Sequence, residues 1–188
     1  MPDELPASVV VAIVESIRRR GMNAFTVEDV ATIAGLDPMT IHDRWGDKEE
    51  LAVRALSAHY EAIISIPDTG SFREDLTTFT HSVARFLTDS TGRLLMRLLV
   101  VDGRGWGAGD VRAEFWRIRF ERVKLMFERA ERRGEIRSGV NYPVAMQLMI
   151  APLHAHALYT EDAIDEDTVN SIIDMAWPAI ASAALHSP

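Results

Sequence analysis

Few side chains in this sequence have the spacing that catalysis or metal binding needs. His154 and His156 form an H-x-H pair in an apolar stretch. Residues two apart on a helix point about 200° apart, so the pair is poorly placed to hold one metal ion. The chain contains no cysteine, no H-E-x-x-H motif, no phosphate-binding glycine loop and no nucleophile paired with a base. We therefore expect no metal, no cofactor and no enzymatic activity.

Two sets of cationic side chains are candidates for binding. Arg18, Arg19 and Arg20 end a helical stretch, where they complement the helix dipole or, alternatively, hold a phosphate. Arg119 lies beside Trp116 in the sequence, and its guanidinium could pair with an acidic ligand or extend to solvent.

The overall charge is acidic. Net charge is −8, and residues 1–60 hold six Lys and Arg against ten Asp and Glu, a balance of −4. Proteins that bind nucleic acid usually carry a basic surface, so this balance predicts weak non-specific affinity for DNA. A locally positive face, or the N-terminus of a helix, could still contact phosphates.

The composition is that of a globular protein. The chain has 188 residues, of which 47% are hydrophobic and 26% charged, enough for a small domain fused to a larger one. No run of about 18 apolar residues occurs, and the N-terminus MPDELPASVV lacks the basic start of a signal peptide. The lack of cysteine fits a reducing compartment. We expect a cytoplasmic protein with no membrane partner.

Hydrophobic residues recur with helical spacing along the whole chain and nowhere alternate as in a strand, which predicts an all-α fold. The turn signal at Pro67–Gly70 marks the start of a second helical layer, and the glycines around Trp106 predict a loop. Beyond residues 26–51, the helical stretches are 7–20, 48–65, one starting at Ser71, 93–101, 110–133, 143–159 and 166–185.

The stretch from Thr26 to Leu51 reads as two short helices and the start of a third. Thr26, with Asp29 three residues later, can cap the first helix, and Gly35 can end it. Asp37 followed by Pro38 starts the second helix. Two helices of about two turns joined at a glycine predict a helix-turn-helix, a unit that usually reads DNA.

The last two helical stretches predict a homodimer. The stretch 143–159 is apolar nearly all round, so it must be buried on every side or meet a second chain. Pairing it and the 166–185 helix with their symmetry mates would form a four-helix interface. The interface candidates are Leu153, His156, Ile172, Ile173, Ala176, Trp177 and Ile180.

The N-terminal pattern resembles the tetracycline-repressor (TetR) family of transcriptional regulators over about residues 9–56. The residues that carry the resemblance are Arg20-Gly21, Phe25-Thr26-Val27, Asp29-Val30-Ala31, Ala34-Gly35-Leu36, Thr40-Ile41, Trp45 and Asp47-Lys48-Glu49-Glu50-Leu51. Further along, Gly134–Arg137 and Ala151-Pro152-Leu153 are similar to one C-terminal subgroup of that family.

The resemblance implies a three-helix DNA-binding domain at residues 1–47 and a larger helical domain at 48–188 that binds a ligand and dimerises. It implies a repressor that binds a palindromic double-stranded operator and is released by a small-molecule effector. By position in the motif, the implied DNA contacts are Thr26, Pro38, Met39, Thr40, His42, Asp43 and Lys48.

Several of these positions depart from the family pattern. His42 stands where the family usually has a tyrosine, and Trp45 replaces the usual phenylalanine of the small core. Pro38 and Met39 can touch a thymine methyl group but cannot read a guanine edge, and Asp43 repels phosphate. Specificity would then rest more on helix N-termini and on DNA shape.

The ligand candidates are aromatic, methionine and arginine side chains of the larger domain. Such a stripe at helical spacing is also what an ordinary core contains. An apolar pocket of several hundred cubic ångströms is expected, roughly the size of drug-sized sites. The candidates are Phe86, Met96, Trp106, Trp116, Arg119, Phe120, Phe127 and Met149, with Phe79 and Met146 in the wider set.

A second reading of the sequence is a dimeric interaction protein of the same fold, with lost or weak DNA binding. The balance of −4 in the first 60 residues and the presence of His42 and Asp43 favour it.

Overall fold

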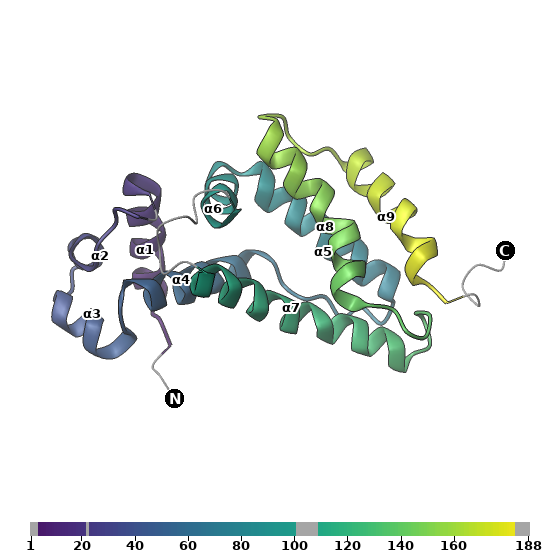
Figure 1. Cartoon of the computed structure of the whole chain (residues 1–188), viewed down its shortest axis with the longest axis horizontal. Helices are drawn as coiled ribbons and strands as arrows, with labels where there is room; N and C mark the ends of the chain where they lie inside the picture. Colours follow the sequence, from purple (N-terminus) through teal and green to yellow (C-terminus); the bar gives the residue numbers. More distant parts are fainter. Residues whose placement is uncertain (1–3, 22, 101–108, 183–188) are drawn as a thin grey trace. The chain divides into compact units, whose positions relative to one another are not determined.

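The computed structural model describes residues 4–21, 23–100 and 109–182, and the expected all-α fold is confirmed (Figure 1). The helices in this part of the chain are α1 (Ala7–Arg20), α2 (Val27–Ala34), α3 (Pro38–Trp45), α4 (Lys48–Ile63), α5 (Phe72–Thr88), α6 (Ser90–Val100), α7 (Gly109–Arg132), α8 (Tyr142–Tyr159) and α9 (Glu166–Ile180). A single antiparallel bridge between Ile136 and Ala181 is the β-pairing seen among the described residues. None of the described helices is both long and apolar enough to cross a membrane.

The chain forms two compact units. The first comprises residues 1–63 and 94–118, and the second comprises residues 64–93 and 119–188. The first unit thus contains α4 as well as the three N-terminal helices, so the expected boundary between residues 47 and 48 falls inside it.

In the first unit, α1 packs against both α2 and α4, and α2 packs against α3 (Figure 1). Ile13 and Ile17 of α1 are fully buried, as are Phe25, Ile41 and Leu51. The small core is therefore built around the buried face of α1, and Ile41 attaches α3 to it.

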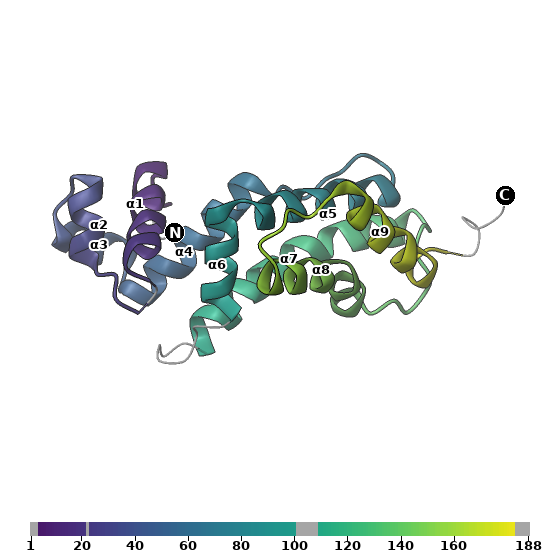
Figure 2. The same ribbon diagram turned by 90° about the horizontal axis from the view of Figure 1, so that it is seen from above.

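In the second unit, α5, α8 and α9 pack against one another (Figure 2). Aromatic rings join the layers: Phe72 of α5 lies 5.1 Å from Phe127 of α7 and 6.2 Å from Trp177 of α9, measured between ring centroids. Phe127 also stacks on Tyr142 of α8 at 5.1 Å. These rings form one continuous apolar core, in which each ring buries a large area.

Polar side chains fasten the start of α5 to the end of α7. Asp75 is completely buried and accepts hydrogen bonds from the Thr69 backbone N–H at 2.8 Å and the Thr69 hydroxyl at 2.9 Å. The Arg133 guanidinium lies 3.7 Å from the other Asp75 oxygen and pairs with Glu135 as well. Glu135 in turn accepts from the Phe72 backbone N–H at the first turn of α5.

Candidate nucleic-acid interface and ligand cavity

The start of α2 is fixed by the predicted capping box. The Thr26 hydroxyl accepts from the Asp29 backbone N–H at 3.2 Å, and the Asp29 carboxylate accepts from the Thr26 backbone N–H at 3.1 Å. Gly35 then ends α2 in the left-handed conformation, with φ 66°. Glycine adopts this conformation readily, whereas residues that carry a Cβ atom do so at a cost. The turn between α2 and α3 is therefore specified locally by the sequence.

The start of α3 is fixed in the same way. The Asp37 carboxylate accepts from the backbone N–H groups of Met39 at 2.7 Å and Thr40 at 3.3 Å, and Pro38 occupies the first helical position. Ile41 and Trp45, four residues apart, are 0% and 2% exposed and attach the helix to the small core. The other side chains of α3 face outward; Pro38, Met39, Thr40, His42, Asp43 and Arg44 are all exposed.

Trp45 serves the small domain as its largest buried side chain. Its backbone carbonyl accepts from the Arg54 guanidinium of α4 at 3.3 Å, while its indole N–H has no hydrogen-bond partner among the described residues. The side chain thus acts as an apolar plug between α3 and α4, in the place where the family pattern has a smaller ring.

Lys48 is tied to the first unit itself. Its ammonium donates to the Asn23 backbone carbonyl at 2.7 Å and lies 4.9 Å from the centroid of the buried Phe25 ring. Lys48 therefore clamps the turn before α2 to the start of α4, a role that the sequence did not predict.

The arginines at the end of α1 are paired with acids. Glu15 accepts from Arg18 and Arg19 at 2.6 to 2.7 Å, and these hydrogen bonds, Arg18 first, lower the pKa of Glu15 to about 2. Arg20 lies 2.9 Å from the Asp29 carboxylate. Each arginine of the Arg18–Arg20 cluster thus pairs with a carboxylate of the same unit, which favours a structural role for this cluster over a phosphate clamp.

Arg44 belongs with the exposed side chains of α3, although it was not among the residues that the sequence singled out. Its guanidinium carbon lies 4.9 Å from the centroid of the Trp45 ring. The signal that could have found it is its spacing, since it lies four residues after Thr40 and so shares a helix face with that residue.

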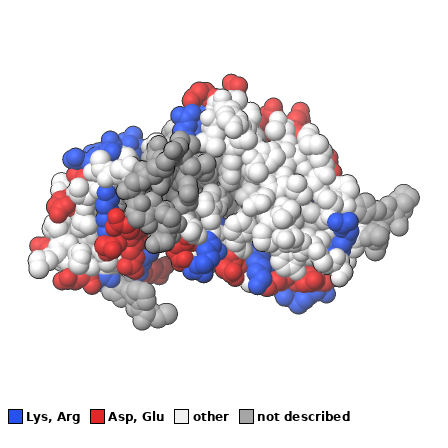
Figure 3. Space-filling model, viewed as in Figure 1, with Lys and Arg blue, Asp and Glu red and all other residues white. Residues whose placement is uncertain are grey.

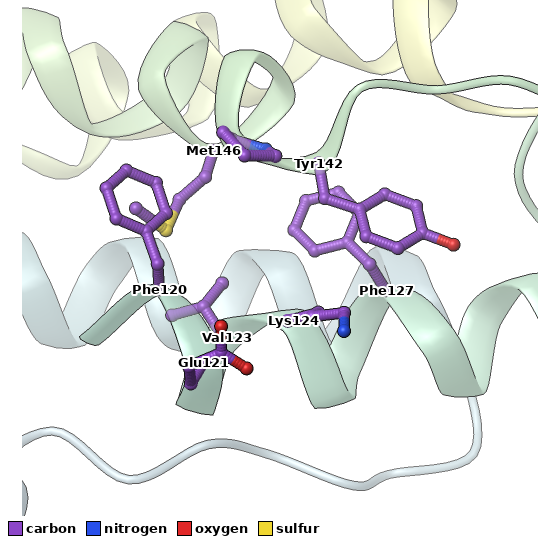
Figure 4. A pocket seen from close by; sticks show the side chains of 8 residues that line it. Phe120, Glu121, Val123, Lys124, Phe127, Tyr142 and Met146 are labelled. Carbon is purple, nitrogen blue, oxygen red and sulfur yellow. The ribbon is translucent and has the colours of Figure 1, made fainter. Parts of the chain in front are cut away.

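The second unit contains a cavity of about 210 Å³ between α7 and α8 (Figure 4). Its walls are mostly apolar, and Glu121 and Lys124 add charge on the α7 side. The lining residues are Phe120, Glu121, Val123, Lys124, Phe127, Tyr142, Pro143 and Met146. The cavity is smaller than the several hundred cubic ångströms expected from the sequence.

Tyr142 is held in place at one end of this cavity. Its ring stacks on Phe127, and its hydroxyl donates to the Glu131 carboxylate at 2.5 Å, pointing away from Met146 (Figure 4). The hydrogen bond to Glu131 raises the pKa of Tyr142 to about 12. Tyr142 therefore presents its ring face, and not its hydroxyl, to the cavity.

The structure brings together only some of the predicted ligand residues. Phe120 and Phe127 line the cavity, and so does Met146 from the wider set. Phe86, Arg119 and Met149 are buried elsewhere in the second unit, Arg119 being 5% exposed, so it does not extend to solvent. In the first unit Met96 is buried and Trp116 half-buried. Trp106 lies outside the described residues.

The predicted interface residues are mostly part of the protomer's own core. His156 is half-buried, and the other six are at most 9% exposed within one chain, so their apolar surface is already covered. The six are Leu153, Ile172, Ile173, Ala176, Trp177 and Ile180. The apolar surface that remains on α8 lies on its opposite face, at Val144, Leu148, Ala151, Pro152 and Tyr159.

The two histidines of α8 lie in a region without metal-binding geometry: among the described residues, no group of three or more His, Asp or Glu side chains is placed to hold a metal ion. Burial lowers the pKa of His154 from 6.5 to about 4. His156 lies near Asp165, the residue that caps α9. We therefore interpret both histidines as part of the packing around α8.

The lowered pKa of His154 predicts a pH-dependent stability. Because the unfolded chain binds this proton more readily than the folded chain, stability is full above about pH 6.5 and falls as the pH drops toward 4. We expect His154 to remove about 2 kcal/mol of unfolding free energy between pH 7.5 and pH 5. Urea unfolding at both pH values should show a smaller change for His154→Gln than for the wild type; equal changes would contradict this assignment.

Two family models match the chain in succession. The one described as "Bacterial regulatory proteins, tetR family" matches residues 9–55, and the one described as "Tetracyclin repressor-like, C-terminal domain" matches residues 66–176. The first covers the helix-turn-helix, and the second covers more than half of the chain, including the helices that line the cavity.

Known proteins align over nearly the whole chain. The "Uncharacterized HTH-type transcriptional regulator YdeS" of Bacillus subtilis (strain 168) is 25% identical over 96% of this chain and 92% of its own length. The "HTH-type transcriptional regulator AqdR" of Rhodococcus erythropolis is 28% identical over 79% of this chain and 72% of its own length. A crystal structure of a TetR family transcription regulator covers 96% of this chain and 100% of its own, with a TM-score of 0.75 and 22% identity, which shows the shared fold.

Proposed function

The chain belongs to the TetR family of helix-turn-helix transcriptional regulators, and we propose that it is a ligand-released repressor that binds a palindromic operator as a homodimer. The observation that carries this proposal is the construction of α3. Its ends are fixed by caps, two side chains anchor it, and the rest of its surface is exposed. A helix presented in this way fits the major groove, where its N-terminal residues contact base edges.

The DNA contacts that we propose combine base edges and phosphates. Met39 is 74% exposed and suits a thymine methyl group, and Thr40 and His42 can donate hydrogen bonds. Thr26, at the N-terminus of α2, would approach the phosphate backbone. Such a regulator would act in the cytoplasm, where the DNA is.

The exposed face of α8 supports the homodimer. Val144, Leu148 and Tyr159 are 49%, 50% and 85% exposed, and Met175 of α9 is 74% exposed. Figure 3 shows that the face over α8 and α9 carries few Lys, Arg, Asp or Glu side chains at its centre. A face that exposes large apolar side chains and carries little charge is typical of a surface that another chain covers. Two copies related by a twofold axis would bury the same patch on each, and would also match the symmetry of a palindrome.

The cavity between α7 and α8 is the effector site that we propose. Three aromatic rings, from Phe120, Phe127 and Tyr142, offer flat apolar walls, and Lys124 and Glu121 supply charge at their side (Figure 4). The site suits a small, largely apolar molecule with a polar end. Since α8 both lines the cavity and carries the exposed apolar face, a ligand there could alter the spacing of the two copies.

Lys48 is expected to contribute to binding at every DNA sequence. Lys48→Ala removes a cation that we propose lies near the DNA phosphates, so it should weaken binding uniformly and reduce the slope of log K against log salt concentration by about one. Loss of the contact with Asn23 would weaken binding without changing this slope, so the slope is the quantity that tests the phosphate contact. Arg132→Ala, which removes an exposed cation of the second unit, is the matched control. Fluorescence anisotropy over a salt series measures both slopes, and an unchanged slope for Lys48→Ala would remove Lys48 from the phosphate contacts.

A reporter experiment tests the repressor role. The DNA that flanks the coding region of this chain is placed before a fluorescent reporter, in a host that lacks the chain. We expect expression of the chain to reduce fluorescence. A rise in fluorescence would indicate an activator, and no change would favour the dimeric interaction protein with weak DNA binding, which the paired arginines of α1 also support.

A further inference from the structure

Asp43 occupies the outermost position of α3. At about 100° per residue, Asp43 lies opposite the midpoint between Ile41 and Trp45, the two side chains that anchor the helix. Its side chain is 72% exposed, and Met39, one turn earlier on the same face, is 74% exposed. The acid therefore stands at the centre of the surface that enters the groove in the proposed function.

In the part of the chain that the structure describes, the Asp43 carboxylate accepts no hydrogen bond. The neighbouring acids Asp29, Asp37 and Asp47 each accept a backbone N–H at the start of a helix. The His42 Nδ1 atom lies 3.7 Å from the Asp43 Oδ1 atom, beyond hydrogen-bond distance. The carboxylate is thus an acceptor that projects from α3 into solvent.

Few groups in the major groove of DNA can make a favourable contact with a carboxylate at this position. It repels phosphates, and every guanine and thymine edge in the major groove offers acceptors to it. Adenine has a donor amino group, but the N7 acceptor lies beside it. Cytosine presents its N4 amino group without a neighbouring acceptor on the same base, and is the usual partner of an acidic side chain.

Resting on the proposed function, we propose that Asp43 determines specificity by accepting a hydrogen bond from the N4 amino group of a cytosine, once in each operator half-site. With guanine or thymine at that position the carboxylate loses water and gains no donor, and at adenine the N7 acceptor beside the amino group opposes it, so these sequences are rejected. The acidic charge of the first unit would also contribute to specificity, because it lowers the affinity for non-operator DNA. We expect a discrimination of about tenfold between cytosine and the other bases at that position.

The test is selection of DNA from a random duplex library by the full chain, followed by sequencing. Four proteins are compared: wild type, Asp43→Ala, Asp43→Asn and Glu28→Gln. Glu28 is an exposed acid of α2, so its substitution removes the same charge from the same unit without altering α3. Asp43 is exposed and makes no structural hydrogen bond, so its variants should fold, which circular dichroism checks.

The expected result is one conserved cytosine in each half-site for the wild type and for Glu28→Gln. Asp43→Ala should lose that preference at this position alone, and Asp43→Asn should shift it to adenine, which an amide reads at N6 and N7. The same base preference in all four proteins would overturn the inference. So would enrichment by Asp43→Ala but not by the wild type, which would leave the DNA-binding function standing. Enrichment by none of the four would overturn the proposed function itself.

Discussion

Replacing Leu148 with glutamate is expected to convert the dimer into monomers. Leu148 is 50% exposed and lies in the middle of the apolar face of α8. Across a twofold axis each copy would bring one new carboxylate into the interface, and burying an unpaired charge costs several kcal/mol. We expect the dissociation constant of the dimer to rise at least about a hundredfold, which corresponds to about 2.7 kcal/mol. Operator affinity should fall with it, because one half-site is then lost.

Leu125→Glu is the matched control for this prediction. Leu125 of α7 is 48% exposed, so the substitution and the exposure are the same, but the residue lies outside the α8 face. Sedimentation at micromolar concentration should show a dimer for the wild type and Leu125→Glu and a monomer for Leu148→Glu. A wild-type monomer, or dimers for all three proteins, would contradict the assignment of the α8 face.

Replacing Asp75 with alanine is expected to cause a large loss of stability. Asp75 is fully buried, and its removal leaves the Thr69 N–H without its acceptor, takes one of two acceptors from the Thr69 hydroxyl, and leaves Arg133 without one of its two carboxylates. Breaking a buried charged network by removing one member costs about 3 kcal/mol or more. Denaturant unfolding should show this loss, and the start of α5 should exchange its amide protons faster.

Glu74→Ala separates this network from a general charge effect. Glu74 is the other acid in the first turn of α5, and it is exposed. Its removal should cost no more than about 0.5 kcal/mol, the usual size of a surface charge near a helix end. Equal losses for the two variants would show that the network around Asp75 does not stabilise the fold.

The helix starts could be predicted from the sequence because they are local. Thr26, Asp37 and Asp47 each accept a backbone N–H two or three residues away, and such caps are visible in any short stretch of sequence. Ile41 and Trp45, the two buried side chains of α3, lie four residues apart, which is the helical spacing that a sequence shows.

The side chains that meet across long distances in the sequence could not be predicted in this way. Lys48 donates to the backbone carbonyl of Asn23, 25 residues earlier, and neither residue type indicates this contact in the sequence. In α8, apolar side chains lie on all sides, so periodicity does not tell the core face from the exposed face. Because of that ambiguity, the sequence does not show that Leu153 is buried within one chain and that Leu148 is exposed.

The ligand residues were harder still, because aromatic side chains serve both a core and a cavity. Phe120 and Phe127 line the cavity, whereas Phe86 fills the core, and all three have similar positions in amphipathic patterns. The difference depends on how α8 packs on α7, which is a property of the tertiary structure alone.

The most direct measurement is a gel shift of the DNA that flanks the coding region of this chain, at 50 and 200 mM salt. A TetR-family regulator that presents α3 to the major groove should retard this DNA at 50 mM salt, and at 200 mM its affinity should be lower by at least about tenfold, because phosphate contacts release counterions. The complex should contain two copies of the chain. A folded, dimeric protein that leaves the DNA unretarded at 50 mM salt would contradict the proposed function.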